Sequence, residues 1–474
     1  MTAVSTDTNV DVAQHKRTIR LVFAALMLVM LLASLSQTVL STALPTIVGS
    51  LSGAEHLAWV MTAYLLAMTV TMPIYGRIGD RFGRKPVLLV AIAVFTIGSL
   101  VGAVADSMTV LIAGRAVQGL GGGGLMVLSQ AAIADVVPAR ERGRYMGILG
   151  AVFAVSSVAG PLLGGWFTEG PGWRWTFWIN VPLGLMAFVA VAYLLHIPRV
   201  HSAPKARIDY LGMALLAIAT SAVILAATWG GHQYDWTSAQ ILSLGALAIV
   251  STIAFVLTER RAGEPVIPMA LFADRNFVLT TIGSLVMGIA MFGSLSYLPT
   301  YMQMSVGVDA THAGLMMIPM MGGLLVTSIV VGQRVSKTGR YRWYPVAGAA
   351  VMGVGLWLLS LLDVGASRWQ IEGSLLVLGI GIGLGMQVMT LIVQNSFSHK
   401  IVGTATAATN FFRQVGGTLG AAAVGSVFTA RLVENLAANL PQSKGQVGSS
   451  SLTPDALATL PEQVREIIVT AYNE

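Results

Sequence analysis

Long apolar segments alternate with short polar ones along most of the chain. Each apolar run is close to the roughly 20 residues that cross the hydrocarbon core of a bilayer as a helix. The thirteen predicted segments are 21–44, 57–75, 87–105, 109–133, 145–167, 177–196, 209–229, 239–258, 277–301, 310–331, 344–362, 373–396 and 403–428. The pattern therefore predicts an all-α polytopic membrane protein.

The basic residues gather in alternate links between these helices. If the N-terminus is cytoplasmic, 21 of the 28 Lys and Arg residues lie in inner links or the N-terminal tail. Five lie in outer links, and Arg115 and Arg413 fall within helices. The positive-inside rule thus predicts a cytoplasmic N-terminus in the cell (plasma) membrane. This placement also explains the net charge of +7 without a nucleic acid partner.

Composition excludes several classes of function. Hydrophobic residues make up 55% of the chain and charged residues only 10%, against about 25% in soluble domains. The absence of cysteine excludes disulfides, thiol catalysis and thiolate metal sites. The sequence has no phosphate-binding loop, no HExxH motif and no carboxylate pair at catalytic spacing. We therefore expect neither an ATP-driven pump nor an enzyme, and no cofactor or metal.

A cluster of charges separates the second and third predicted helices. Residues 76–85 hold Asp80 and four cations between two apolar runs. Because arginine side chains and helix N-termini stabilise a carboxylate, we predict that Asp80 is a latch that bonds to Arg81, Arg84 or a neighbouring helix. The alternative is a topology signal with one incidental acid, but such a signal needs no acid. The candidate switch residues here are Gly76, Asp80, Arg81, Gly83 and Arg84.

A weaker copy of this cluster lies at residues 332–340, with Ser336 in the place of Asp80. The second helix then corresponds to the tenth, an offset of eight, which predicts two six-helix halves with two helices inserted between them. The predicted parts are a cytoplasmic tail (1–20), an N-terminal half (21–196), the inserted pair (197–275), a C-terminal half with five helices (276–430) and an extracytoplasmic segment (431–474). The second half lacks one helix, so we expect a last helix to be missing.

Three more motifs follow in order. The fourth helix carries Leu111, Arg115, Gln118, Gly119 and Gly121, and the fifth carries residues 160–165, Gly-Pro-Leu-Leu-Gly-Gly. The third motif is the aromatic-rich segment 173–182, which leads into the sixth helix. With the cluster around Asp80, these motifs resemble the major facilitator superfamily, specifically its fourteen-helix drug:proton antiporter branch, over essentially the whole chain. The resemblance implies the major facilitator fold and secondary efflux of amphipathic or cationic toxic compounds by alternating access, coupled to protons.

One position departs from the pattern of that branch. An aspartate in helix one is replaced by Ser36, just before Gln37 and Thr38. At 1.5 Å per residue, Ser36 lies about 12 Å and Arg115 about 9 Å below the outer ends of their helices, so the two could face each other. Because serine does not titrate, three explanations are open: coupling has moved to Asp135 or another acid, the chain is a coupling-deficient variant, or it is an uncoupled facilitator or lipid transporter. A non-transporting sensor or scaffold is a further alternative.

The remaining candidates lie within helices. Arg115 and Gln118 are predicted to couple protons or substrate, or else to brace helices one and four, since intramembrane charge is costly. Gly160, Pro161 and Gly164 are expected to permit close helix approach and bending. The candidate residues of a substrate cavity are Gln37, Tyr64, Tyr297, Tyr301, Met317, Met321, Gln387, Asn410 and Arg413. The expected partners are a small-molecule substrate, the proton and membrane lipid, and we expect a monomer.

Overall fold

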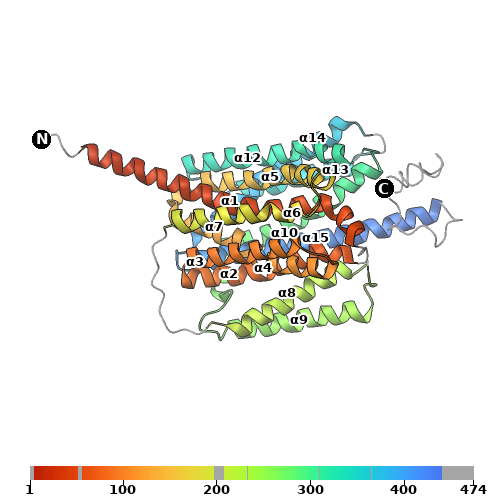
Figure 1. Cartoon of the computed structure of the whole chain (residues 1–474), viewed down its shortest axis with the longest axis horizontal. Helices are drawn as coiled ribbons and strands as arrows, with labels where there is room; N and C mark the ends of the chain where they lie inside the picture. Colours follow the sequence, from red (N-terminus) through yellow and green to blue (C-terminus); the bar gives the residue numbers. More distant parts are fainter. Residues whose placement is uncertain are drawn as a thin grey trace.

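The computed structural model describes residues 5–51, 56–196, 208–231, 233–308, 310–363 and 366–439. In these ranges the chain consists of helices, turns and short irregular links, without a β-strand. The helices run side by side along the length of the molecule (Figure 1). Most of the expected extracytoplasmic segment, residues 440–474, lies outside the described residues.

The helices follow one another with short links. Their bounds are α1 (Ser5–Leu51), α2 (Leu57–Phe82), α3 (Arg84–Ala103), α4 (Met108–Val136), α5 (Ala139–Glu169), α6 (Trp175–Trp178), α7 (Asn180–Leu194), α8 (Tyr210–Trp229), α9 (Ala239–Glu259), the 3-10 helix η2 (Met269–Ala273), α10 (Arg275–Met304), α11 (Ala310–Met316), α12 (Ile318–Thr338), α13 (Tyr344–Ser360), α14 (Arg368–Ser396) and α15 (Val402–Asn439).

The described helices confirm the prediction of an all-α polytopic membrane protein. Twelve helical spans are long and apolar enough to cross a bilayer, and α13 is a shorter apolar helix of 17 residues. Each of the thirteen predicted segments corresponds to one of them. Apolar length predicts these helices well because a backbone in lipid must satisfy its hydrogen bonds within a helix.

The charged cluster at residues 76–85 is helical, although the sequence suggested a link. Helix α2 continues to Phe82, and α3 begins at Arg84. Only Gly83 separates them, and its φ of +90° is a conformation that glycine adopts without the strain of a Cβ atom. Helix α2 therefore continues through polar residues beyond its apolar run, and a hydropathy pattern does not predict this polar part of the helix.

Two of the predicted helices are interrupted. The sixth is divided at Ile179 into α6 and α7, and the tenth is divided at Met317 into α11 and α12. Each break stands shortly before a proline, Pro182 or Pro319, which has no backbone N–H to donate to the preceding turn.

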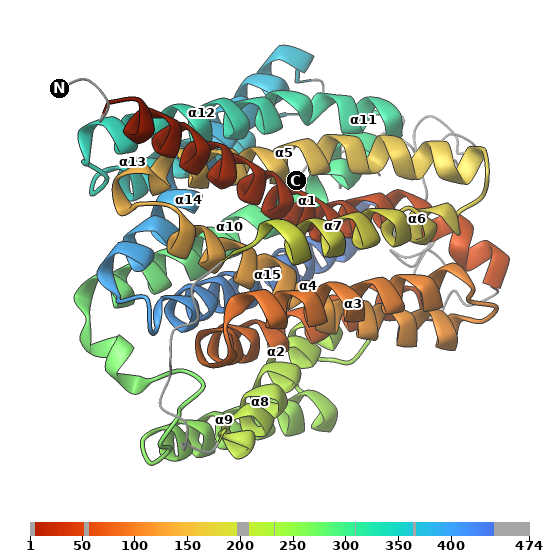
Figure 2. The ribbon, with the colours of Figure 1, turned by 60° about the vertical axis from the view of Figure 1, so that its left-hand side comes forward.

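The helices pack in two groups. In the first group, α1 packs against α4, α5 and α7, and α4 also packs against α2 and α3. In the second group, α10 packs against α14 and α15, and α14 also packs against α12 and α13. Between the groups, α5 packs along α12 and α2 packs along α15. Helices α8 and α9 pair at one edge of the bundle, where α8 contacts α2 and α15 (Figures 1 and 2). The division into halves and an inserted pair stays a prediction.

Candidate functional site

Asp80 lies where α2 meets the first turn of α15, and we call this end of the bundle the Asp80 end. Asp80 Oδ1 accepts a hydrogen bond from Gly403 N at 3.1 Å, and Oδ2 accepts from Thr404 N at 2.6 Å and Thr404 Oγ1 at 2.8 Å. Gly76, one turn earlier, is close enough to α15 that a Cβ atom there would clash with Ala407. The carboxylate thus binds the positive end of a helix dipole that belongs to the other packing group.

Arg84 connects Asp80 to a second carboxylate. Its guanidinium lies 3.0 Å from Asp80 Oδ1 and 3.0 Å from Asp135 Oδ2, and it also donates to the carbonyl of Ala131. Asp135 Oδ1 lies 3.1 Å from Nδ1 of His399, in the link before α15. Asp135 therefore belongs to the contact at the Asp80 end and lies far from Arg115 along α4.

Two further cations of the cluster, Arg77 and Arg81, pair with a glutamate that the sequence did not single out. Glu264 Oε2 lies 3.0 Å from Arg77 and 3.4 Å from Arg81. The link that carries Glu264 is held by Glu259, which is 3% exposed and accepts hydrogen bonds from the backbone N–H groups of Val266 and Ile267. The connection after α9 is therefore a folded segment attached to α2.

The copy of the cluster forms an equivalent contact at the same end. A Cβ atom at Gly332 of α12 would clash with the Gly143 carbonyl of α5, as one at Gly76 would clash with α15. Four residues later, Ser336 Oγ accepts a hydrogen bond of 2.7 Å from Arg144 N. This contact thus repeats the arrangement around Asp80, with a neutral hydroxyl in place of the carboxylate. Gly332 and Ser336 correspond to Gly76 and Asp80, and Gly143 and Arg144 correspond to Gly403 and Thr404.

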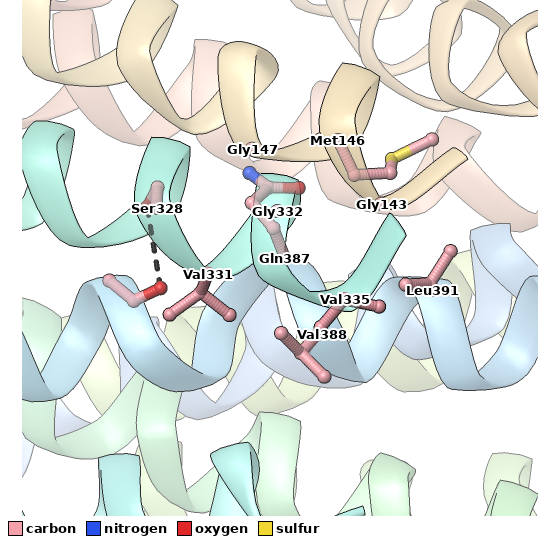
Figure 3. A pocket seen from close by; sticks show the side chains of 11 residues that line it. Gly143, Met146, Gly147, Ser328, Val331, Gly332, Val335, Gln387, Val388 and Leu391 are labelled. Atoms are coloured by element: carbon pink, nitrogen blue, oxygen red, sulfur yellow. Dashed lines mark hydrogen bonds between the residues drawn. The ribbon is translucent and has the colours of Figure 1, made fainter. Parts of the chain in front are cut away.

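A small cavity lies beside this second contact, between α5, α12 and α14 (Figure 3). Ser328 donates to the carbonyl of Gly383 across its edge, and Gln387 and Val331 line it. Its volume of about 10 Å³ is near the minimum for one water molecule, so this cavity is too small for an organic substrate.

Arg115 and Ser36 belong to one buried network. Arg115 Nη1 donates to Gln118 Oε1 at 2.5 Å, and Nε donates to the Val60 carbonyl at 3.2 Å. Gln118 Nε2 in turn donates to Ser36 Oγ at 2.9 Å and to Ser99 Oγ at 2.7 Å. The guanidinium also lies 4.1 Å from the centre of the fully buried Tyr64 ring, so Tyr64 supports Arg115. All of these partners are uncharged.

Helix α5 approaches α1 through two of its glycines. A Cβ atom at Gly160 would clash with Thr38, and one at Gly164 would clash with Thr42, whereas one at Gly165 would meet nothing within 4 Å. The helix continues through Pro161 to Glu169. Gly160 and Gly164 are therefore at a close contact between membrane helices, and Gly165 faces open space.

A second buried network joins the two packing groups. Asn410 Nδ2 of α15 donates to Gln130 Oε1 of α4 at 2.9 Å, and Gln394 Nε2 of α14 donates to the Gln130 carbonyl at 3.0 Å. Arg413 Nη2 donates to Asn410 Oδ1. The network places a guanidinium where α4 and α15 meet.

Three of the other candidate cavity residues, Tyr301, Met317 and Met321, share one methionine-rich cluster, and Tyr297 and Gln37 do not belong to it. Tyr297 stacks on Phe428 with ring centres 5.6 Å apart, and Tyr301 lines a separate cavity of about 310 Å³ with Leu298, Met302, Leu359, Ser360, Leu362 and Ile371. Met321 is buried in a methionine-rich cluster, and Met317 stands at the helix break. Gln37 is half-buried on α1. That these residues line one substrate cavity stays a prediction.

Sequence reasoning missed Glu259, Glu264 and Arg142. Arg142 is buried and donates to the carbonyls of Val137, Ala134 and Gln394 and to Asn395 Oδ1, so it joins α5 to α14. A signal existed for the glutamates, since both stand within four residues of Arg260 and Arg261, at the end of α9 and in the link that follows it. No such signal distinguished Arg142 from its neighbours Arg140 and Arg144.

Comparison with known proteins adds three findings. The sequence profile of the Major Facilitator Superfamily matches residues 26–421. An uncharacterized MFS-type transporter of Mycobacterium tuberculosis (strain H37Rv) is 42% identical over 454 residues, which cover 96% of this chain and 66% of that protein. The multidrug transporter protein MdtP of Bacillus subtilis (strain 168) is 37% identical over 418 residues, which cover 88% of this chain and 76% of that protein. The chain thus spans just under two thirds of the length of the mycobacterial relative.

The proton:xylose symporter XylE, a solved structure, has the same fold. It matches with a TM-score of 0.61 at 15% identity, over 97% of this chain and 94% of that chain. A match at this level of identity shows a shared fold alone.

Proposed function

Because this chain belongs to the major facilitator superfamily, we propose that it is a secondary transporter that exports amphipathic toxic compounds by alternating access. The name of its Bacillus subtilis relative, a multidrug transporter, supports export of drug-like molecules. We place it in the cell membrane with a cytoplasmic N-terminus, so the Asp80 end faces the cytoplasm, and we assign it no enzymatic reaction.

One observation carries this proposal. Asp80 bonds α2 of one packing group to the N-terminus of α15 in the other through hydrogen bonds to Gly403 and Thr404. A buried carboxylate at a helix N-terminus is a contact that forms only when the two groups meet. Parting of the groups at this end would break that contact and open the interior, as alternating access requires.

Proton coupling is the finer part of the proposal. Asp135 is the candidate acid, although its ion pair with Arg84 places it at the Asp80 end. A second candidate function, an uncoupled facilitator, is favoured by Ser36, whose hydroxyl bonds to Gln118 where the drug:proton branch has an aspartate. The same fold with a lipid substrate, or without transport, remains the alternative if no organic compound is moved.

The resemblance to the drug:proton branch also implies cationic substrates. A carboxylate near the centre of a membrane helix would support a preference for cationic substrates. Among the described helices, Asp and Glu residues stand near helix ends, so the proposal is for amphipathic compounds without a requirement for positive charge.

Everted membrane vesicles test both transport and coupling. Wild type should take up a fluorescent amphipathic substrate, and an imposed inside-acid pH gradient should drive that uptake if protons are coupled. If the gradient drives uptake only in Ser36→Asp, and not in the uncharged control Ser36→Asn, the natural chain is an uncoupled facilitator. If neither wild type nor Ser36→Asp moves any compound in vesicles that contain folded protein, the proposed transport is wrong.

A further inference from the structure

Two charged side chains stand deep inside the described membrane helices, and both are arginines. Arg115 of α4 is fully buried, and Arg413 of α15 is 8% exposed. Acidic residues of the described helices stand instead near helix ends, such as Asp80, Asp135 and Glu372. The interior of the described bundle is therefore positively charged without a carboxylate to compensate it.

The two arginines differ in how fully they are held. Arg115 bonds to Gln118 and Val60 and lies over the Tyr64 ring, so it is fixed within the first packing group. Arg413 has one hydrogen bond among the described contacts, from Nη2 to Asn410 Oδ1. Its guanidinium has five N–H donors, and most of them stay available to a further acceptor.

The partner of Arg413 reaches across the junction between the groups. Asn410 Nδ2 donates to Gln130 Oε1 on α4, at the meeting of α4 and α15. If the groups part, this bond breaks, and Asn410, Gln130 and Arg413 become accessible on facing surfaces. A cation that is buried beside neutral amides gains most from an anionic partner, because its water is gone and no carboxylate has replaced it.

We propose that Arg413 is a specificity-determining residue that binds an anionic group of the substrate, a carboxylate or a sulfonate, and that Asn410 and Gln130 position its guanidinium. This inference rests on the proposed transport function and names its substrate class as amphipathic organic anions. A planar guanidinium binds such groups through two parallel hydrogen bonds. An organic cation would meet two uncompensated positive charges in the same interior and is selected against.

Matched dyes test the preference. Transport of carboxyfluorescein, an anionic xanthene dye, is compared with that of rhodamine 123, a cationic dye of the same ring system, in vesicles that contain the full chain. Wild type should transport the anionic dye at least several-fold faster. A second measurement needs no variant: 1-naphthoate should compete with dye transport, and 1-naphthylmethylammonium should not.

Variants then assign the preference to one residue. Arg413→Gln should lower transport of the anionic dye at least tenfold, Arg413→Lys should retain part of it, and Arg413→Glu should reverse the preference. Arg431→Gln, an exposed arginine on the same helix, is the matched control and should change neither rate.

Three results would overturn the inference. Faster transport of the cationic dye by wild type would exclude a preference for anions. An equal loss of both dyes in Arg413→Gln, with the preference unchanged, would show that Arg413 serves packing of α4 on α15. Failure of wild type to move either dye or to respond to either competitor would instead refute the transport function itself.

Discussion

Replacement of Asp80 with asparagine tests the contact that closes the Asp80 end. The side chain is 2% exposed and accepts three hydrogen bonds from Gly403 and Thr404 and one from Arg84 at 3.0 Å. Asparagine has nearly the same shape but carries one acceptor oxygen and no charge. If its amide N–H₂ replaces Oδ1, the bonds from Gly403 N and Arg84 are lost; if it replaces Oδ2, the bond from Thr404 N is lost, while the Thr404 hydroxyl can accept instead. The bonds that remain lose the charge of their acceptor.

The size of the effect follows from these contacts. Hydrogen bonds to a charged group contribute about 1.5–3 kcal/mol each, and removal of one member of a buried ion pair costs about 3–5 kcal/mol. We therefore expect the closed conformation to lose about 3 kcal/mol relative to the open one. Since 1.36 kcal/mol is a factor of ten, the ratio of closed to open molecules should fall about a hundredfold.

The chain is well suited to a direct measurement because it contains no cysteine. Spin labels on Phe82→Cys and Lys400→Cys, both exposed residues on either side of the Asp80 contact, report the distance between α2 and the start of α15. Electron paramagnetic resonance should show a short-distance population in wild type that moves to longer distances in Asp80→Asn. The exposed Asp106, at the opposite end, supplies the control Asp106→Asn. A distance distribution that is unchanged by Asp80→Asn would refute the latch.

The remaining predictions concern other contacts. Arg115→Ala should abolish export, because the buried network loses its guanidinium, while the protein should still insert in the membrane. Drug-resistance assays measure export and immunoblots of membranes measure insertion; normal resistance would contradict a functional role. Gly164→Ala should lower the melting temperature through a loss of about 1–3 kcal/mol from overpacking against α1, whereas Gly165→Ala, which meets open space, should not. Glu264→Gln should weaken the attachment of the link after α9 to Arg77 by about 0.2–1 kcal/mol. Amide hydrogen exchange in that link should become faster, and exchange as slow as in wild type would contradict the prediction.

Much of the helix arrangement is predictable from the sequence because lipid imposes a simple physical rule. Runs of apolar residues located all thirteen membrane segments, and the helical rise placed Ser36 and Arg115 at similar depth, where Gln118 now connects them. The breaks at Ile179 and Met317 were harder to predict from the sequence. A proline in a helix can bend it, interrupt it or leave it continuous, as Pro161 does, and neighbouring helices decide which.

Contacts between distant segments were harder to predict than the helices. The repeat around Gly332 and Ser336 identified a second copy of the cluster, but packing alone reveals that its partner is α5. Glu264 lies 183 residues from Arg81 in sequence, and nothing local records that they pair. The position of Asp80 at a helix N-terminus, in contrast, followed from charge and dipole, which are local properties of the residues involved.

The two repeated contacts at the Asp80 end share a geometry and differ in chemistry. Around Asp80 the bonds are charge-assisted, while around Ser336 a hydroxyl makes two, one from Arg144 N at 2.7 Å and one to the Glu141 carbonyl at 3.3 Å. Charge-assisted hydrogen bonds are roughly twice as strong as neutral ones. Because the two contacts between the packing groups differ in strength, we expect the groups to separate asymmetrically. We therefore expect the contact between α5 and α12 to part first, and the Asp80 contact between α2 and α15 to part last.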